Sequence, residues 1–409
     1  MNVPKLRFKD NNDNDYPNWV NSTIGKSGYF YYGKSAPKWS ITDTATTPCV
    51  RYGELYTTHN IIVKKIYSYT NIPKENLKFS TGNEVLVPRV GEEPLDFCKC
   101  CYLPFKDVAI GEMISIYNTK NNPLFISYMF NGTMKYKFAR LVEGGNVSNL
   151  YYSYLENISI NLPCLEEQKK IANFLSTVDK KIINLENTIT NLENQKKGLL
   201  QQIFSQKLRF KDKNGNNYPN WEKKKLGDTL LIQRGGSPRP ISDYITNDKN
   251  GLNWIKIGDC SPNSNIITST KEKIKPEGLS KTREVFIGDL ILSNSMSFGR
   301  PYILNINGCI HDGWLLLRNT KKIYNLQFLC YILGSEYTTK QYKKLASGST
   351  VNNLNIELVS SVDITIPCLE EQTKIADFLS AFDRKLENQK AQLEHWKQIK
   401  KGLLQQMFV

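Results

Sequence analysis

The residues best suited to carry out chemistry form two short clusters, and each lacks a part that catalysis needs. Gly25-Lys26-Ser27 has the composition of the end of a phosphate-binding loop, but Val20 occupies the place of the glycine that should open such a loop. His311-Asp312-Gly313 combines an imidazole with a carboxylate, and the first half of the chain has no counterpart to it. We therefore interpret His311-Asp312-Gly313 as a turn or a base-contacting loop rather than as a catalytic pair.

Paired carboxylates and a cysteine cluster also occur, and both have a structural explanation. Glu166-Glu167 and Glu370-Glu371 fall in the first turn of predicted helices, where negative charge interacts favourably with the helix dipole. Cys98 and Cys101 form a C-x-x-C pair, but neither a second pair nor a suitably spaced histidine follows. We interpret these cysteines as ordinary thiols and predict no metal site.

The sequence shows no positive sign of an active site. It contains no G-x-S-x-G element, no dinucleotide-binding fingerprint and no Asn-Pro-Pro-aromatic methyltransferase motif. Nine scattered cysteines suit a reducing compartment better than a disulfide framework. Neither an apolar run of about 18 residues nor an apolar leader is present. We therefore expect a non-catalytic, cytoplasmic protein that binds no membrane and carries no cofactor.

The charge of the chain is strongly basic, with a formal net charge of +15 among 409 residues. Such an excess suggests a polyanionic partner, most often nucleic acid. Residues 222–362 alone hold 19 Lys and Arg against 12 Asp and Glu. The alternative is a Lys- and Asn-rich composition whose charges are simply solvated.

Candidate DNA-binding residues are Lys and Arg, which contact phosphates, and Arg, Asn, Gln and Ser, which read base edges, in glycine-containing loops that allow close approach of the backbone. In the second half, these residues are Gln233, Arg234, Ser237, Arg239, Lys273, Lys281, Ser295, Arg300, Ser349, Thr350 and Asn352. In the first half, they are Tyr32, Lys34, Lys38, Lys64, Lys65, Arg89, Asn146 and Asn149. The aromatic run Tyr29–Tyr32 fits equally well beneath a sugar-phosphate backbone or in a core strand.

These loops lie between sequence blocks that are written twice. Leu6-Arg7-Phe8-Lys9-Asp10 and Tyr16-Pro17-Asn18-Trp19 recur at an offset of 202 residues, and the segment 163–204 recurs as 367–408 at an offset of 204. The inserts between them, about 20–162 and 222–366, differ in sequence but hardly in length. Constant flanks around divergent inserts indicate one scaffold that presents two inserts of the same kind to two targets.

The segments 163–204 and 367–408 are predicted to be long helices. Their apolar residues alternate in steps of three and four, which is the pattern of a coiled-coil seam. The predicted seam residues are Ile171, Leu175, Ile182, Leu185, Ile189, Leu192, Ile375, Leu379, Leu386, Leu393, Trp396 and Leu403. Because Gln389, Trp396 and Lys400 make the second seam bulkier and more polar, we expect the two helices to pair within one chain rather than as a homodimer zipper.

The inserts are predicted to be mixed α/β domains. Strands are expected at Asn60–Ile66, Glu84–Val90, Met113–Tyr117, Trp254–Ile257, Asp289–Ser293 and Trp314–Arg318, and helices at Leu124–Tyr136 and Leu326–Lys344. Each insert then closes on a Gly/Asn loop and a final strand, Ile158–Leu162 or Val362–Ile366. Because Val147 aligns with Val351 at the helix offset, we expect both inserts to share a fold.

This organisation resembles the specificity (S) subunits of type I restriction-modification systems. The resemblance rests on the doubled LRF and YPNW segments, the doubled P-C-L-E-E-Q-x-K-I-A-x-F-L-S helix start, the Gly/Asn loop before it and the doubled KKGLLQQ end, and it covers the whole chain. It implies an α+β fold with two target recognition domains, 1–162 and 207–366, joined by antiparallel spacer helices, 163–206 and 367–409.

The resemblance also implies the partners and the function. Each recognition domain would read one half of a bipartite sequence in double-stranded DNA, and the helices would dock two methyltransferase (M) subunits, to which up to two restriction (R) subunits would add. S-adenosylmethionine, ATP and Mg would then be bound by the partner subunits. Two alternatives stay open: a stand-alone bipartite DNA-binding regulator, and a duplicated interaction scaffold.

Overall fold

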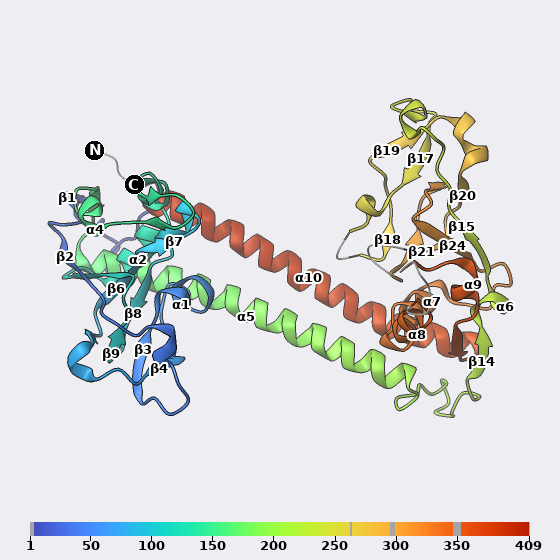
Figure 1. Ribbon diagram of the computed structural model, residues 1–409, viewed down its shortest axis with the longest axis horizontal. Coiled ribbons are helices and arrows are strands. Elements are labelled where there is room, and N and C mark those ends of the chain that lie inside the picture. The colour runs from blue at the N-terminus through green and yellow to red at the C-terminus, as the bar shows by residue number, and fades with distance from the viewer. Residues whose placement is uncertain (1–3, 262–263, 295–298, 347–352, 409) are drawn as a thin grey trace. The chain divides into compact units, whose positions relative to one another are not determined.

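The computed structural model describes residues 4–261, 264–294, 299–346 and 353–408. The chain divides into two compact units, one formed by Met1–Glu186 with Gln392–Val409 and the other by Asn187–Ala391 (Figure 1). Each unit therefore contains one of the two inserts together with segments of both long helices.

The insert of the first unit is built on two four-stranded sheets. The first sheet is antiparallel, in the order β2 (Gly28–Tyr32), β10 (Ile114–Thr119), β6 (Glu84–Pro88) and β8 (Cys101–Leu103). The second has the order β4 (Ser68–Thr70), β3 (Thr47–Val50), β9 (Lys106–Ile110) and β5 (Phe79–Thr81), in which β3 and β9 are parallel. Around the sheets lie α1 (Tyr52–Thr57), α4 (Tyr152–Leu155) and the short ribbon β7 (Val90–Gly91), β12 (Ser148–Asn149) and β11 (Glu143–Gly144).

The insert of the second unit repeats this strand order with different side chains and with one additional edge strand in each sheet, β18 or β16. One sheet has the order β15 (Leu231–Arg234), β24 (Trp314–Arg318), β21 (Leu290–Ser293), β22 (Pro301–Leu304) and β18 (Ile266–Ile267). The other has the order β16 (Ile245–Thr246), β19 (Glu272–Ile274), β17 (Leu252–Ile255), β23 (Gly308–Ile310) and β20 (Arg283–Val285), with β17 and β23 parallel. The antiparallel pairs β1 (Val20–Thr23) with β13 (Ser159–Leu162), and β14 (Glu222–Lys225) with β25 (Asp363–Ile366), close the two inserts. The expectation of a shared fold is confirmed.

One backbone crossing illustrates the shared fold at atomic detail. A Cβ atom on Gly33 would lie 2.0 Å from the carbonyl oxygen of Gly111, and one on Gly235 would lie 2.0 Å from that of His311. No side chain fits at such a distance, so glycine is required where the chain leaves β2 and where it leaves β15. The two glycines are 202 residues apart, which is the offset of the LRF and YPNW repeats.

Each predicted insert helix is in fact two helices. Leu124–Tyr136 is replaced by α2 (Pro123–Asn131) and α3 (Lys135–Ala139), because Gly132 leaves the helical region with φ −92° and ψ −91°. Leu326–Lys344 is replaced by α7 (Leu326–Leu333) and α8 (Glu336–Ala346). There Ser335 starts a new helix, since its hydroxyl accepts a hydrogen bond from the backbone N–H of Thr338 at 3.4 Å.

Most predicted strands are present, with small shifts at their ends. Trp314–Arg318 coincides with β24, and the final strands appear as β13 and β25. The strand predicted at Asn60–Ile66 is wrong, because only Ile62 forms an isolated bridge, to Tyr102. The apolar side chains of that segment include Val63, which is fully buried without belonging to a sheet.

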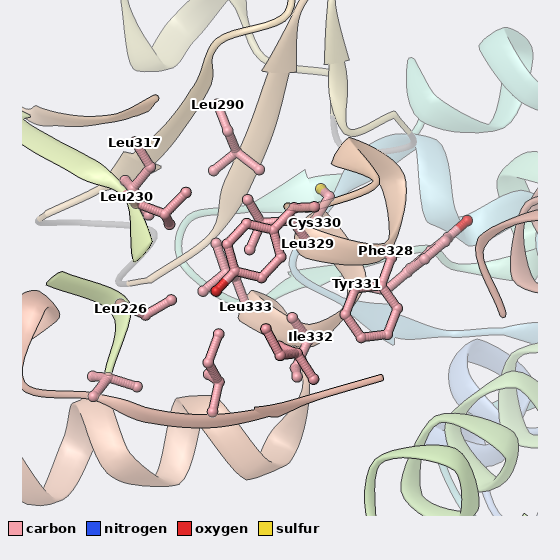
Figure 2. Packing of buried hydrophobic residues seen from close by; sticks show 14 of the residues in the cluster. Leu226, Leu230, Leu290, Leu317, Phe328, Leu329, Cys330, Tyr331, Ile332 and Leu333 are labelled. Atoms are coloured by element: carbon pink, nitrogen blue, oxygen red, sulfur yellow. The ribbon is translucent and has the colours of Figure 1, made fainter. Parts of the chain in front are cut away.

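The core of each unit combines the insert helix with the end of a long helix. In the second unit, α7 packs with α6 (Leu226–Thr229), α9 (Ile356–Ser360) and the β15–β24 sheet, and Figure 2 shows its side chains from Phe328 to Leu333 gathered with Leu226, Leu230, Leu290 and Leu317. Ile375 and Leu379 belong to the same cluster, while Ile171 and Leu175 belong to its counterpart in the first unit. The first turns of both long helices are therefore part of the insert cores.

The long helices are α5 (Leu165–Phe204) and α10 (Leu369–Met407). The predicted fold class, two mixed α/β domains with two long helices that pack on each other, is confirmed. Among the described residues, no helix combines the length and the apolar character that crossing a membrane would require.

Candidate nucleic-acid interface

The doubled flanking motifs form a buried ionic latch at the start of each long helix. In the first unit, Arg7 donates hydrogen bonds from Nε and Nη2 to the two carboxylate oxygens of Glu167, at 3.0 and 2.8 Å. The indole of Trp19 donates to the same carboxylate at 3.2 Å, and the Glu167 side chain is fully buried. This pair joins the LRF and YPNW segments to α5, and the glutamate raises the pKa of Arg7 through its hydrogen bond.

The second unit reproduces the latch almost atom for atom. Arg209 donates to Glu371 at 2.9 and 2.8 Å, and the indole of Trp221 donates at 3.1 Å. Glu167 and Glu371 therefore have the structural role that the sequence predicted, but a buried ion pair, rather than the helix dipole alone, explains it. The sequence signal for this pairing was present, because Arg, Trp and Glu are all repeated with the flanks.

A glutamine one residue further along each helix holds the insert. The side chain of Gln168 accepts a hydrogen bond from the backbone N–H of Asn122 at 2.8 Å and donates to the carbonyl of Pro163 at 2.9 Å. Gln372 accepts from the backbone N–H of Asn325 at 2.9 Å. Asn122 and Asn325 are the N-caps of α2 and α7, so the Glu-Gln pair of each repeat connects the latch to the main helix of the insert.

Ion pairs fix the two long helices against each other within each unit. In the first unit, Asp179 of α5 accepts from Tyr128 at 2.7 Å and pairs with Lys400 of α10 at 2.6 Å. In the second, Asp383 accepts from Tyr331 at 2.6 Å and pairs with Lys196. Early residues of one helix thus meet late residues of the other, so the segments run antiparallel in both units.

The predicted seam residues differ in burial between the two helices. Those of α5 are buried, namely Ile171, Leu175, Ile182, Leu185, Ile189 and Leu192. On α10, Ile375 and Leu379 are buried, whereas Leu386, Leu393, Trp396 and Leu403 are partly buried. The polar residues on the α10 seam thus coincide with weaker burial.

In the first unit, the structure brings Tyr32 and Arg89 together. The Arg89 guanidinium lies 4.3 Å from the ring centroid of Tyr32 and 5.6 Å from that of Tyr151. Its Nε is buried and has no hydrogen-bond acceptor among the described residues. Asn149 lies on β12 and is paired with Val90 of β7, the residue next to Arg89. Tyr32, Arg89 and Asn149 therefore form one small surface.

The predicted lysines of the first unit are exposed on loops that lead into strands of the second sheet. Lys34 and Lys38 follow β2, and Lys64 and Lys65 precede β4. The side chain of Trp39, next to Lys38, is 72% exposed, and sequence reasoning missed it. A large aromatic residue beside a lysine could have been recognised as a possible base- or sugar-stacking group. Of the run Tyr29–Tyr32, Phe30 is buried, as the core-strand interpretation requires. Tyr29 is exposed, and its packing beneath a sugar-phosphate backbone stays a prediction.

In the second unit, the glycine turn after β15 organises the predicted contacts. Ser237 donates a hydrogen bond to Asp312 at 2.7 Å, which lowers the pKa of that carboxyl, and Arg239 lies 3.6 Å from the same group. The Arg239 side chain remains 83% exposed. The turn therefore presents the Arg239 guanidinium to solvent, while the contacts to Asp312 hold the turn in place.

More positive charge surrounds this turn. Arg283 donates to the carbonyl of Arg234 at 3.4 Å, which places a second arginine, missed from the sequence, beside a predicted one. Lys281 donates to the hydroxyl of Tyr244 at 2.7 Å. A Cβ atom on Gly236 would lie 2.8 Å from the Lys281 carbonyl, so Lys281 lies next to the turn. We call Arg234, Arg239, Lys281 and Arg283 the basic cluster of the second unit.

The other predicted residues do not belong to this cluster or lie outside the described residues. Gln233 is half-buried on β15, Lys273 donates to the carbonyl of Lys249, and Arg300 lies over the ring of Tyr302 at 5.1 Å. Asn146 is exposed in the β11–β12 turn. Ser295, Ser349, Thr350 and Asn352 lie outside the described residues.

The possible catalytic clusters have other roles. His311 Nδ1 accepts a hydrogen bond from the backbone N–H of Gly313 at 2.8 Å, so its 3.7 Å approach to Asp312 is not an ion pair. Burial lowers the pKa of His311, which favours the neutral ring. Cys98, Cys100 and Cys101 are buried, and burial raises the pKa of each thiol. Within the described part of the chain, no group of three or more potential metal ligands occurs.

Comparison with known proteins agrees with this doubled scaffold. The sequence profile described as the type I restriction modification DNA specificity domain matches the chain twice, over residues 9–194 and 218–395. The chain belongs to this family. It is a type I restriction-modification specificity subunit, the non-catalytic component of systems whose enzymatic activities reside in partner subunits.

Curated specificity subunits are similar over most of the chain. The type I restriction enzyme MjaVIII specificity subunit of Methanocaldococcus jannaschii is 27% identical over 74% of this chain and 74% of its own length. The StySPI specificity subunit of Salmonella potsdam is 24% identical over 80% of this chain and 72% of its own length.

Solved structures share the fold. The type I restriction-modification S subunit from M. genitalium superimposes with a TM-score of 0.62 at 17% identity, covering 100% of this chain and 99% of its own. A chain from a study of complex assembly and conformational transition of the type I restriction-modification system has a TM-score of 0.60, also at 17% identity, and covers 95% of this chain and 97% of its own.

Proposed function

We propose that this specificity subunit binds a bipartite target in double-stranded DNA, with the insert of each unit reading one half-site. The observation that carries the proposal is that two inserts of one topology and different sequence are attached to the helices through identical latches. The attachment of each insert to its long helix is thus constant, while the side chains that would contact DNA differ between the inserts.

The charges of the exposed loops support DNA as the partner. The basic cluster of the second unit combines Arg239, which is largely exposed, with three further cations beside a glycine turn. In the first unit, Lys34, Lys38, Lys64 and Lys65 are exposed, and the exposed Trp39 directly follows Lys38. Lys and Arg bind phosphates and Arg also reads guanine, while an exposed aromatic ring can stack on a base or pack against a sugar.

The helices α5 and α10 serve, in this proposal, as spacers between the half-sites and as docking surfaces for two methyltransferase subunits. Two equivalent latches and two equivalent ion pairs would allow one asymmetric chain to bind two copies of one partner. Up to two restriction subunits then add to that complex in the cytoplasm. S-adenosylmethionine, ATP and Mg belong to these partner subunits, and this chain binds no cofactor.

Mapping of methylated adenines in host DNA by modification-sensitive sequencing tests the proposal. From the family resemblance, we expect two short specific parts separated by a non-specific gap of about six to eight base pairs, which would place the centres of the half-sites about one helical turn apart. Exchange of residues 20–162 for the insert of another family member should change one part of the motif, and exchange of 222–366 should change the other. A continuous motif would contradict the proposal.

Individual contacts are tested by salt-dependent DNA binding of the subunit assembled with its methyltransferase. Arg239→Ala should reduce the slope of log K against log salt by about one, as expected for one lost phosphate contact. Lys223→Ala is the control, because Lys223 is also an exposed cation paired with an aspartate, Asp363, but it lies on β14 and outside the basic cluster. Equal effects of both substitutions would contradict an interface at the basic cluster.

A further inference from the structure

Two further ion pairs connect α5 and α10, and they differ in kind from those of Asp179 and Asp383. Glu186 pairs with Lys397 at 3.1 Å in the first unit, and Glu193 pairs with Lys390 at 2.8 Å in the second. In both pairs the glutamate belongs to α5 and the lysine to α10. The negative charges thus lie on one helix and the positive charges on the other.

The 204-residue offset shows what this separation of charge does. Position 397 of α10 corresponds to position 193 of α5 (397 − 204), and position 390 corresponds to position 186 (390 − 204). If α5 paired in the same register with α5 of a second copy, Glu186 would face Glu193 of that copy. Two α10 helices would likewise bring Lys390 opposite Lys397. Both homotypic pairings therefore place like charges together.

The aspartate pairs behave differently under the same operation. Asp383 corresponds to Asp179 and Lys400 to Lys196, each at the 204-residue offset. A homotypic α5 pair would still bring Asp179 opposite a lysine, Lys196 of the second copy. The aspartate pairs thus support the antiparallel register in any pairing and cannot distinguish one helix from the other.

The apolar seam does not make this distinction for α5 either. Ile182, Leu185, Ile189 and Leu192 are buried and form an uninterrupted apolar heptad pattern, which would also suit a second α5 helix. We propose that Glu186, Glu193, Lys390 and Lys397 form a pairing code through which α5 accepts α10 and rejects another α5. This code acts independently of DNA recognition.

The code is made of exposed charges, so its strength comes from the number of pairs. The four side chains are 32–50% exposed, and Lys397 also lies 4.0 Å from Glu394 of its own helix. Changing one such pair from opposite to like charge weakens the pairing about two- to fivefold. When two chains exchange helices, four pairs change together, which corresponds to a factor on the order of 10². The effect is screened by salt.

Two full-length variants test the code. The lysine variant, E186K/E193K, has lysine at all four positions, and the glutamate variant, K390E/K397E, has glutamate at all four. In each variant, pairing of α5 with α10 of the same chain brings like charges together. Pairing with a second copy of the same variant does so as well. Mixed together, α5 of each variant meets α10 of the other with opposite charges in all four pairs.

The expected result is a 1:1 complex of the two variants. Sedimentation velocity at about 50 µM, after unfolding and refolding the mixture, should show at least tenfold more dimer than either variant alone or the unmodified chain. Two helices of one chain are held together by an effective concentration in the millimolar range. A gain of about 10² should lower the dissociation constant of the mixed dimer from that range to about 10 µM, which is below the protein concentration used. About 0.5 M salt should reduce the complex. A mixture that sediments as the sum of its components would overturn the proposal.

A second measurement covers the case in which a variant does not fold. The variant that carries all four substitutions restores opposite charges within one chain, and its urea midpoint should return to that of the unmodified chain. Both two-residue variants should have lower midpoints. A four-residue variant as unstable as the sum of the two would show that the charges do not act as a code.

Discussion

The buried glutamate of each latch leads to a quantitative prediction for Glu167→Gln. The carboxylate accepts two hydrogen bonds from Arg7 and one from Trp19, with no exposure to solvent. Removing one partner of a buried ion pair costs about 3–5 kcal/mol. Because the Arg7 side chain is 19% exposed and still donates to the carbonyls of Tyr16 and Pro17, we expect the lower limit, about 3 kcal/mol.

The assay is thermal unfolding of the whole chain, combined with hydrogen exchange to assign the change to a unit. For a unit of about 200 residues, each 1 kcal/mol lowers the transition by about 2–4 °C, so the shift should be about 6–12 °C. Loss of protection should be concentrated in the first turns of α5. Glu371→Gln should give the same shift in the second unit, because its distances agree with those of the first latch within 0.1 Å.

The control and the double variant sharpen this test. Glu166→Gln, at the exposed neighbour, should shift the transition by less than about 2 °C. Arg7→Met leaves a fully buried carboxylate without its cation and should cost more than Glu167→Gln, whereas the double variant should cost less than the sum of both. A shift below about 2 °C for Glu167→Gln, or strict additivity, would refute the latch.

Further predictions concern the helices, pH and the thiols. Tyr128→Phe and Tyr331→Phe each remove a hydrogen bond to an aspartate and should cost about 1 kcal/mol in urea unfolding, since the aspartate keeps its lysine. Burial raises the pKa of Tyr117 and Tyr324 to about 12 from 10.0, so the stability that their protonated state contributes is complete below pH 10 and should fall as the pH rises from 10 to about 12. At pH 8, alkylation followed by mass spectrometry should find the buried Cys100, Cys101 and Cys330 protected in the folded chain. Insertion of one heptad into both long helices, about 10 Å of added length, should change the gap of the DNA motif but not its bases.

Features that are periodic or repeated could be predicted from the sequence. The duplicated flanks gave the two-part organisation, and the heptad pattern gave α5 and α10 to within two residues of their ends. The breaks at Gly132 and Ser335 were missed because the apolar pattern continues across both turns. Burial of Val63 in a non-strand segment explains the one strand that is absent.

The candidate interface was less predictable for a physical reason. Arg89 and Tyr32 are far apart in sequence and meet only through the order of strands in the sheet. Arg283 was missed because its neighbour Arg234 lies on a different sheet. A pair of divergent inserts offers no repeat that would mark such positions, whereas the latch residues are marked by their repetition.

The glutamine mounts bear on how this protein can evolve. Gln168 and Gln372 hold their inserts largely through backbone groups, such as the N–H of Asn122 or Asn325 and the carbonyl of Ile323. Because these hydrogen bonds are made to backbone groups, most side-chain substitutions in the insert leave them unchanged. If the inserts read DNA as we propose, new target specificities can therefore arise through substitutions in an insert or its replacement, without loss of its attachment to the long helix.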